Sequence, residues 1–255
     1  LSSENDTMRT SLIPGLLKTI SNNMSKGQKP LKLFEIGSVY FSDSQGNRIE
    51  KTVLTAAVLG PYELTPWKPR GKEYDFYDLK GAFDKLCSQC GLQIDFLAKA
   101  EKPFLLPEKS VNCKSGDNVL GYLGELSPEN TGIIEKVFVW EMDLQAMEDS
   151  LPSRTRFQNI AKFPETYRDI SILVDRQVTS QQVSDLILKT GQPLLSRVEL
   201  YDHFEGKKIQ SDKKSLTFAL SFQSKDRTLS DDDVNPLFET IVQMLKAELA
   251  ASLRD

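Results

Sequence analysis

Histidine and cysteine are scarce in this chain of 255 residues. The single histidine, His203, excludes metal sites built from several imidazoles and leaves one candidate base for a catalytic triad. The three cysteines are odd in number and lack the spacing of a disulfide framework, which indicates a reducing, cytoplasmic compartment. The motif Cys87-x-x-Cys90 closes a predicted helix, where the dipole opposes a thiolate, and no second pair completes a zinc site. We therefore interpret the cysteines as structural thiols and expect no metal site.

Long hydrophobic runs are also missing, so the sequence predicts no membrane span. No Gly-x-x-x-x-Gly-Lys loop is present to cradle nucleotide phosphates. The net charge of −4 argues against nonspecific coating of nucleic acid but is compatible with a local binding site. The chain opens at Leu1 without an initiator methionine, and we expect it to be the C-terminal fragment of a longer protein.

The most informative stretch runs from Leu200 to Arg227 and is typical of two strands joined by a short basic loop. On the second strand, apolar residues alternate with Ser215, Thr217, Ala219 and Ser221. This period of two predicts one buried face and one open face of small, mostly hydroxyl-bearing side chains. Such an open face suits flat, unstacked bases, although an ordinary half-buried strand with a solvated back shows the same pattern.

The elements around this hairpin predict a known arrangement. A strand with alternating apolar residues over 170–174 precedes a helix that Thr179 caps. After the hairpin, the acidic segment 230–233 caps a second helix, and a last short strand is predicted at Leu253. The order strand, helix, strand, strand, helix, strand is the ferredoxin-like βαββαβ arrangement.

Residues 1–150 show a different pattern. Predicted strands cover 31–41, 52–59, 111–113, 119–123 and 138–144, and predicted helices cover 14–24 and 78–90. Mostly antiparallel strands with a few helices indicate an α+β domain. The periodicity is lost over 151–160, where Pro152 and polar residues predict a linker. The sequence thus predicts two domains, residues 1–150 and 161–255.

Motifs in both halves resemble one family. Those in the second half are similar to the ferredoxin-fold anticodon-binding domain that closes the β subunit of bacterial phenylalanyl-tRNA synthetases: Phe163-Pro164-x-x-x-Arg168-Asp169-Ile170, Lys213-Lys214-Ser215-Leu216 and Phe222-Gln223-Ser224-x-Asp226-Arg227-Thr228-Leu229. Those in the first half resemble the catalytic-like module of the same subunit: Met8-Arg9-Thr10-Ser11-Leu12, Leu33-Phe34-Glu35-Ile36-Gly37, Asp78-Leu79-Lys80-Gly81, Gly121-x-x-Gly124-Glu125-Leu126 and Glu141-x-Asp143-Leu144.

The resemblance implies a class II synthetase-like antiparallel sheet domain that does no chemistry, followed by the ferredoxin-like domain. The residues agree with the lack of chemistry. A working class II core has an arginine two residues before the glutamate of its second motif, to grip ATP phosphate. In this chain the residue two positions before Glu35 is Leu33, which cannot donate to a phosphate. We therefore expect no catalytic residue here.

The resemblance also suggests an RNA site. Phe204 occupies the position of the family's aromatic residue that stacks on an anticodon base, and Asp202 and Ser215 are candidates for hydrogen bonds to base edges. The candidates for phosphate contacts are Lys207, Lys208, Lys213, Lys214 and Arg227.

Each of these residues also has an ordinary structural interpretation. Phe204 suits a core, Asp202 suits a turn, and the lysines suit a solvated hairpin tip. Arg227 is a candidate partner of Asp226. Asp202 shares strand phase with the apolar Leu200, so a bulge or twist must intervene if Asp202 faces outward.

The predicted function is a noncatalytic part of phenylalanine–tRNA ligase, in which residues 1–150 scaffold the catalytic α subunit and residues 161–255 bind the anticodon region of tRNA(Phe). The resemblance implies an (αβ)2 assembly in the cytoplasm, with ATP and Mg in the partner α subunit and no cofactor in this chain. The alternative is a purely architectural subunit-interface module that does not touch RNA.

Overall fold

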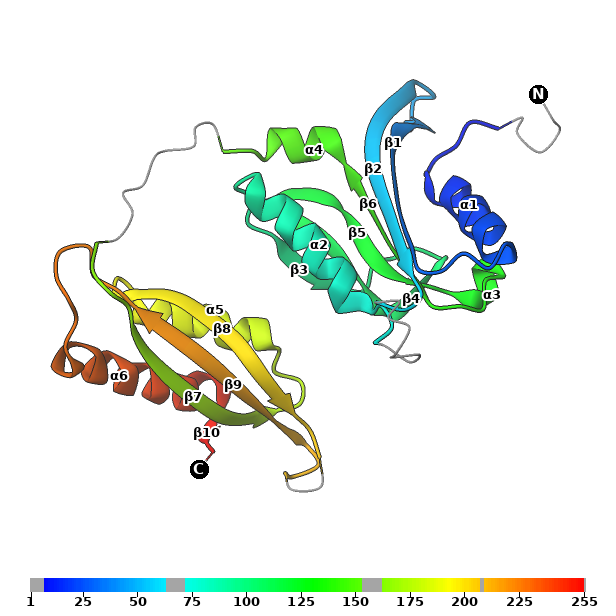
Figure 1. Cartoon of the computed structure of the whole chain (residues 1–255). Helices are drawn as coiled ribbons and strands as arrows, with labels where there is room; N and C mark the ends of the chain where they lie inside the picture. Colours follow the sequence, from blue (N-terminus) through cyan, green and yellow to red (C-terminus); the bar gives the residue numbers. More distant parts are fainter. Residues whose placement is uncertain (1–6, 63–71, 153–161, 207–208, 255) are drawn as a thin grey trace. The chain divides into compact units, whose positions relative to one another are not determined.

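The computed structural model describes residues 7–62, 72–152, 162–206 and 209–254 of the chain (Figure 1). The chain divides into two units, Leu1–Arg156 and Phe157–Asp255. Most of the predicted linker lies outside the described residues, so the domain boundaries stay a prediction. Among the residues described, no helix combines the length and the hydropathy that a bilayer span requires.

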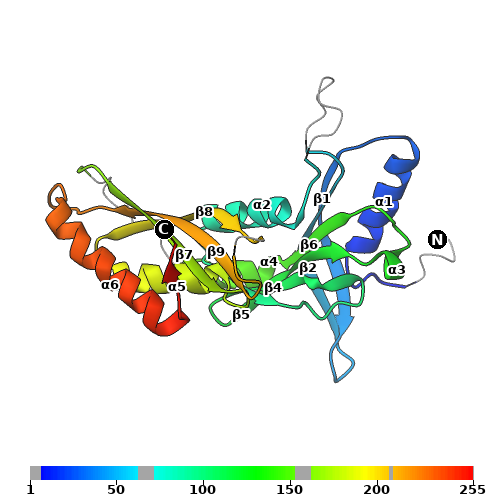
Figure 2. The same ribbon diagram turned by 90° about the horizontal axis from the view of Figure 1, so that it is seen from below.

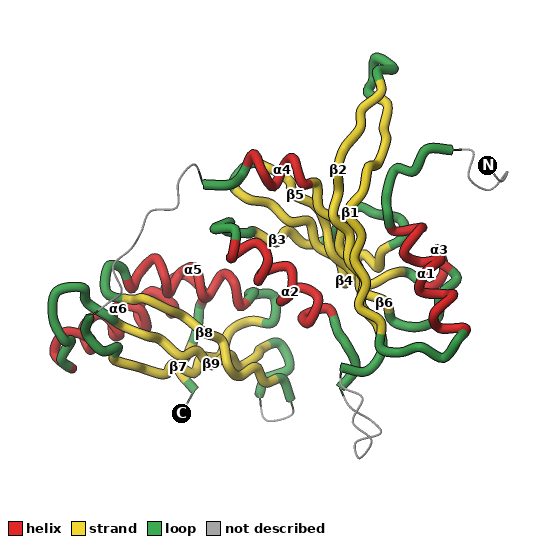
Figure 3. Tube along the Cα trace, turned by 45° about the horizontal axis from the view of Figure 1, so that its top comes forward, coloured by secondary structure: helices red, strands yellow, loops and turns green. Residues whose placement is uncertain are grey.

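The first unit is built on a six-stranded antiparallel sheet in the order β1-β2-β6-β5-β4-β3 (Figure 3). Its strands are β1 (Leu31–Ser42), β2 (Arg48–Leu59), β3 (Asp95–Ala98), β4 (Leu105–Ser115), β5 (Asn118–Leu126) and β6 (Val137–Asp143). Its helices are α1 (Ile13–Ser25), α2 (Phe76–Gln89), α3 (Pro128–Thr131) and α4 (Leu144–Asp149). The predicted strands are all present, and the interior position predicted for β2 is confirmed. The sequence pattern missed the short elements β3, α3 and α4.

Two helices cover the two faces of this sheet. Helix α1 buries Ile13, Leu16 and Ile20 against one face, and helix α2 buries Leu79 and Phe83 against the other. Helix α1 begins within one residue of the predicted Pro14, whereas α2 begins two residues before the predicted Asp78, after an aspartate capping box that the sequence pattern did not indicate. The buried side chains form two separate apolar clusters, one on each side of the sheet.

The second unit has the predicted βαββαβ order, which confirms the ferredoxin-like fold. Its elements are β7 (Thr166–Asp175), α5 (Ser180–Gly191), β8 (Leu195–Phe204), β9 (Lys213–Phe222), α6 (Asp231–Leu249) and β10 (Ser252–Leu253). The antiparallel sheet has the order β10-β7-β9-β8, and both helices pack on the same face (Figure 2). Among the described residues of this unit, no helix covers the opposite face, which we call the helix-free face.

Candidate nucleic-acid interface

The strand register decides which side chains lie on the helix-free face. Strands β7 and β9 pair residue for residue, with Ser171 opposite Thr217 and Leu173 opposite Ser215. Directly opposite residues of an antiparallel pair project from the same side. The intervening residues, such as Phe218, are buried against the helices. Ser215 and Thr217 therefore belong to the helix-free face, as the alternation predicts.

A bulge in β8 brings the predicted RNA residues onto this face. Leu200 lies opposite Phe218, but Asp202 lies opposite the next residue, Thr217, so β8 holds one extra residue here. Beyond the bulge, Phe204 lies opposite Ser215. The bulge that an outward Asp202 requires is thus present, and it places Asp202 and Phe204 on the helix-free face.

Phe204 is not a core residue, because 38% of it is exposed. The guanidinium of Arg254 lies over its ring, 5.5 Å from the ring centroid. Strand β10 positions this arginine by pairing Ser252 with Leu173, and the Arg254 N–H donates to the Ser171 carbonyl at 2.9 Å. The sequence analysis missed Arg254, since only the pairing of β10 with β7 brings it to Phe204.

The expectation of an open row of hydroxyls is wrong. Ser215 is only 1% exposed, and Thr217 and Ser221 are also buried. Arg254 covers Ser215 and donates from Nη1 to its Oγ at 3.0 Å. The hydroxyl of Thr217 is 3.1 Å from that of Ser171. Short side chains on a central strand are covered by longer side chains from both neighbouring strands, so they line the floor of the face instead of its surface.

The basic residues divide into different environments. Lys207 and Lys208 lie outside the described residues. Lys214 lies opposite the fully buried Val174, so it projects toward the helix side, whereas Lys213 projects from the helix-free face. Within the described ranges, neither of these last two lysines has a carboxylate within 4 Å, and both stay candidates for phosphate contacts.

Arg227 has a structural partner, although not the one considered from the sequence. It donates from both terminal nitrogens to Asp233, at 2.7 and 2.6 Å, and not to Asp226. The same carboxylate accepts from the backbone and hydroxyl of Ser230 and completes the cap of α6. Arg227 and Ser230 together hold the pKa of Asp233 well below its usual range. Arg168 also contacts the first turn of α6, where it pairs with Asp231.

An ionic cluster holds the base of the β8–β9 hairpin. Arg176, in the turn after β7, pairs with Glu205, and its backbone N–H donates to the Asp212 carbonyl at 2.9 Å. The Arg176 guanidinium, with a smaller contribution from His203, lowers the pKa of Glu205. His203 Nε2 lies 3.2 Å from Glu205 Oε1. The only histidine of the chain therefore lies at a hairpin contact and not beside a nucleophile.

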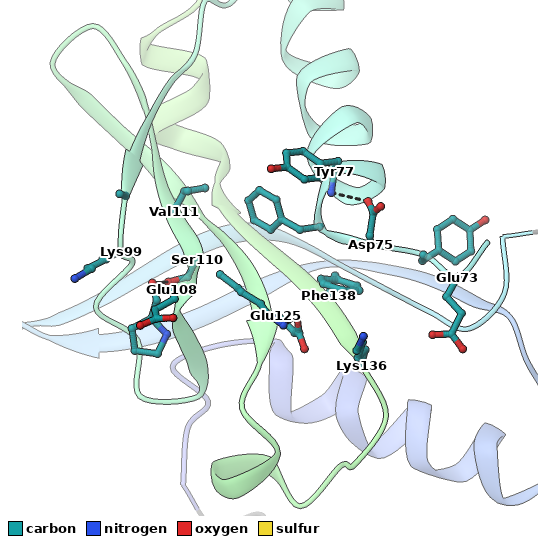
Figure 4. Close-up of a pocket in the computed structure, with 15 residues that line it drawn as sticks. Glu73, Asp75, Tyr77, Lys99, Glu108, Ser110, Val111, Glu125, Lys136 and Phe138 are labelled. Carbon is teal, nitrogen blue, oxygen red and sulfur yellow. Dashed lines mark hydrogen bonds and ion pairs between the residues drawn. The ribbon is translucent and has the colours of Figure 1, made fainter. Parts of the chain in front are cut away.

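The first unit contains a pocket of about 740 Å³ between the start of α2 and strand β4 (Figure 4). Aromatic side chains such as Phe138 and Tyr77 line it together with the ion pair of the buried Glu125 and the half-exposed Lys109, whose charged atoms are 2.7 Å apart. The lining includes neither histidine nor cysteine. Throughout the described parts of the chain, no group of three or more His, Cys, Asp or Glu residues is arranged to hold a metal.

Both halves of the chain match the profile of a known domain. Residues 1–144 match the phenylalanyl tRNA synthetase beta chain CLM domain, and residues 161–254 match the ferredoxin-fold anticodon binding domain. The chain belongs to the phenylalanyl-tRNA synthetase β chain family. The resemblance noted in the sequence motifs is thereby confirmed across both units.

Two curated relatives are both phenylalanine–tRNA ligase β subunits. The protein from Dehalococcoides mccartyi is 35% identical over all of this chain and 31% of its own length. The protein from Carboxydothermus hydrogenoformans is 30% identical over all of this chain and 32% of its own length. This chain thus spans about a third of the length of these relatives. A solved pyrrolysyl-tRNA synthetase of Desulfitobacterium hafniense is 20% identical over 55% of this chain and 48% of its own, with a TM-score of 0.41, too low to support an argument.

The synthetase-like motifs of the first unit form structural contacts in the described residues. Arg9 Nη1 binds Glu35 Oε1 at 2.9 Å, and Arg9 Nε donates to the Ser38 carbonyl at 2.9 Å. A Cβ on Gly37 would lie 2.6 Å from Arg9 Nη2, so a larger residue there would push the end of this arginine aside. Leu33 is half-buried and packs against the α1-side core. The segment that resembles the second motif therefore ties Arg9 to strand β1. At the position where a working core has its phosphate-binding arginine, this chain has Leu33.

The cysteines lie in positions that disfavour the thiolate. Cys87 and Cys113 are fully buried, and Cys90 lies at the C-terminal end of α2. Burial raises the pKa of Cys87 to about 11 and also raises that of Cys113. Since the thiolate is the reactive form, these values agree with thiols that contribute to packing.

Proposed function

We propose that this chain is a noncatalytic part of the β subunit of phenylalanine–tRNA ligase, whose second unit binds the anticodon region of tRNA(Phe). The observation that carries the proposal is the cluster of Phe204, Asp202 and Arg254 on the helix-free face. An exposed ring stacks on a base, a carboxylate accepts from base amino groups, and a guanidinium binds phosphate or stacks. Lys213 on the same face adds charge for the RNA backbone.

Binding of an anticodon stem-loop to the whole chain, measured by fluorescence anisotropy, tests this function. Replacing Phe204 with Ala should weaken binding by about 5- to 150-fold, the loss of one stacked base. Phe204→Trp should retain binding. Phe41→Ala is the matched control, because Phe41 is similarly exposed (41%) but lies in the first unit. Equal affinity of the wild type and a folded Phe204→Ala variant would refute the proposed site.

A purely architectural role for both units is the second candidate. Two observations favour it: Ser215 is covered, and Arg227 is engaged by Asp233, so two predicted RNA contacts are unavailable in this conformation. The same binding experiment discriminates the two functions. A chain that binds no tRNA at low salt, although it still binds the catalytic subunit, has the architectural role alone.

For the first unit we propose a scaffolding role toward the catalytic α subunit. Strand β1 is a sheet edge that exposes two large apolar residues, Phe34 (74%) and Ile36 (57%). They lie opposite Ala56 and Leu54, which belong to the α2-side cluster, so they extend that apolar face to the edge. Exposed apolar residues on an unpaired edge strand are typical of a protein interface.

Co-purification with the α subunit tests the scaffold. Changing Phe34 and Ile36 together to Asp should abolish it, whereas Ile134→Asp, at a position that is 88% exposed in the loop after α3, should not. Unchanged co-purification of the double variant would place the interface elsewhere. The complete assembly is proposed to be a cytoplasmic (αβ)2 tetramer in which the α subunit holds ATP and Mg.

A further inference from the structure

The helix-free face extends well beyond the Phe204 cluster. Ser221 lies six residues along β9 from Ser215, which corresponds to about 20 Å of strand. Opposite Ser221 lie Tyr167 on β7 and Arg197 on β8. Because these three residues are directly paired across the sheet, they project from the same side as Ser215 and Phe204. The face therefore has an aromatic side chain at each end.

Tyr167 is accessible and its hydroxyl is held in place. It is 64% exposed, and its hydroxyl donates to Glu165 Oε2 at 2.9 Å. The neighbouring side chain on β9, Ser221, is buried, so the accessible group at this position is the Tyr167 ring and not the serine. Arg197 is also exposed on the other side of Ser221, where its Nη2 pairs with Glu199 Oε2 at 2.8 Å.

Acidic side chains occupy the middle of the face. Asp169 and Glu199 lie on either side of Ala219, and both are exposed. Carboxylates repel phosphates but accept hydrogen bonds from the amino groups of adenine, cytosine and guanine. A strand of RNA across this region would therefore place its bases toward the sheet and its phosphates away from it. The aromatic rings at the two ends of the face also favour bases that point toward the sheet, because bases stack on such rings.

We infer that Tyr167, with Arg197 beside it, is a second base-stacking position for a single-stranded RNA segment that runs along β9 from Phe204. This inference rests on the proposed RNA-binding function of the second unit. The occupant is RNA because the position continues the same face as the Phe204 cluster and presents an exposed aromatic ring there. At roughly 3.4 Å per nucleotide for a stacked strand, about six nucleotides span the two rings, and fewer suffice if the strand is extended.

The dependence of binding on RNA length tests this inference. The whole chain is titrated with oligoadenylates of about two and ten nucleotides, the shorter one too short to join the two rings and the longer one above the stacked span of about six. Tyr167→Ala should weaken binding of the longer RNA by about 5- to 150-fold and leave the shorter one unchanged. Tyr167→Phe should retain binding of both, because only the hydroxyl is lost. Tyr77→Ala, at a position that is 75% exposed in the first unit, is the matched control.

The outcomes separate this inference from the function on which it rests. If the wild type binds neither RNA, the proposed function fails. If Phe204→Ala weakens both RNAs while Tyr167→Ala changes neither, RNA binding stands and the second stacking position is wrong. If Tyr167→Ala leaves RNA binding intact but prevents association with the α subunit, Tyr167 belongs to a protein contact and the inference is also overturned.

Discussion

Replacing the buried carboxylate of Glu141 tests how the first unit holds its N-terminal helix. Glu141 is 7% exposed on β6. Its Oε2 accepts from the Ser11 hydroxyl at 2.9 Å, the Leu12 N–H at 2.9 Å and the Thr55 hydroxyl at 2.8 Å, and its Oε1 accepts from the Tyr122 hydroxyl at 2.8 Å. The N-cap position of α1 makes no side-chain cap of its own, so this carboxylate provides the negative charge near the helix start.

The size of the effect follows from the four donors. In Glu141→Gln, the amide oxygen can take the place of Oε2, and the Tyr122 hydroxyl can rotate to accept from the amide nitrogen. Hydrogen bonds to charged groups contribute roughly 1.5–3 kcal/mol and neutral ones about 0.5–1.5 kcal/mol. The three bonds to Oε2 are weakened, and the easier desolvation of the neutral amide offsets part of that loss. We therefore expect the free energy of unfolding to fall by about 1–3 kcal/mol. Glu141→Leu leaves four donors without an acceptor and should cost about 3–5 kcal/mol.

Hydrogen exchange measures this loss locally, which matters because the two units need not unfold in one transition. Amides of α1 should exchange faster in Glu141→Gln and faster still in Glu141→Leu, while those of α6 in the second unit stay unchanged as an internal reference. Glu50→Gln, an exposed carboxylate on β2, is the control and should resemble the wild type. Identical α1 exchange in Glu141→Leu and the control would refute the assignment of these contacts to stability.

Three further predictions concern charge and chemistry. Replacing Lys213 and Lys214 with Ala should weaken binding of all RNA sequences and reduce the slope of log affinity against log salt by about one per lost phosphate contact, as titrations at several salt concentrations would show. Because the pKa of Asp233 is lowered in the folded state, the unfolded chain takes up its proton first as the pH falls. The stabilisation from the Arg227–Asp233 pair should be complete above about pH 5 and disappear progressively below about pH 4, so acid titration followed by circular dichroism should show a weaker dependence in Asp233→Asn. The isolated chain should give no ATP–pyrophosphate exchange, because Leu33 cannot bind phosphate, and measurable exchange would contradict this.

Local patterns in the sequence predicted most of the second unit. The alternation along β9 assigned Phe218 to the core, and Thr179 predicted the start of α5, where the structure adds a capping box with Gln182. Such signals depend on neighbours within a few residues. The partner of Arg227 lies six residues away across a loop, and the sequence offered the adjacent Asp226 as an equally reasonable acceptor.

Exposure on the helix-free face could not be predicted from alternation, because it depends on what the neighbouring strands place there. The alternation assigned Ser215 to the correct face, but its 1% exposure results from Phe204 on β8 and from Arg254, which follows β10. The extra residue in β8 decides on which face of the sheet Phe204 lies, and no turn residue in the sequence indicates that bulge. Family resemblance predicted an RNA contact for Phe204, where strand parity alone was ambiguous.

The position of Arg254 changes how a base can reach Phe204. In this conformation its guanidinium lies over the Phe204 ring and also donates to the Ser215 hydroxyl. One side chain therefore covers both the aromatic ring and the hydroxyl. A cation over an exposed ring contributes about 0.5–1 kcal/mol, less than the roughly 1–3 kcal/mol of a stacked base. A base that displaces the arginine must also offset the lost hydrogen bond to Ser215, so we expect a net gain where the displaced guanidinium contacts the RNA. Displacement would also uncover Ser215, so the hydroxyl that is buried in the free protein becomes available to a base only when one has arrived.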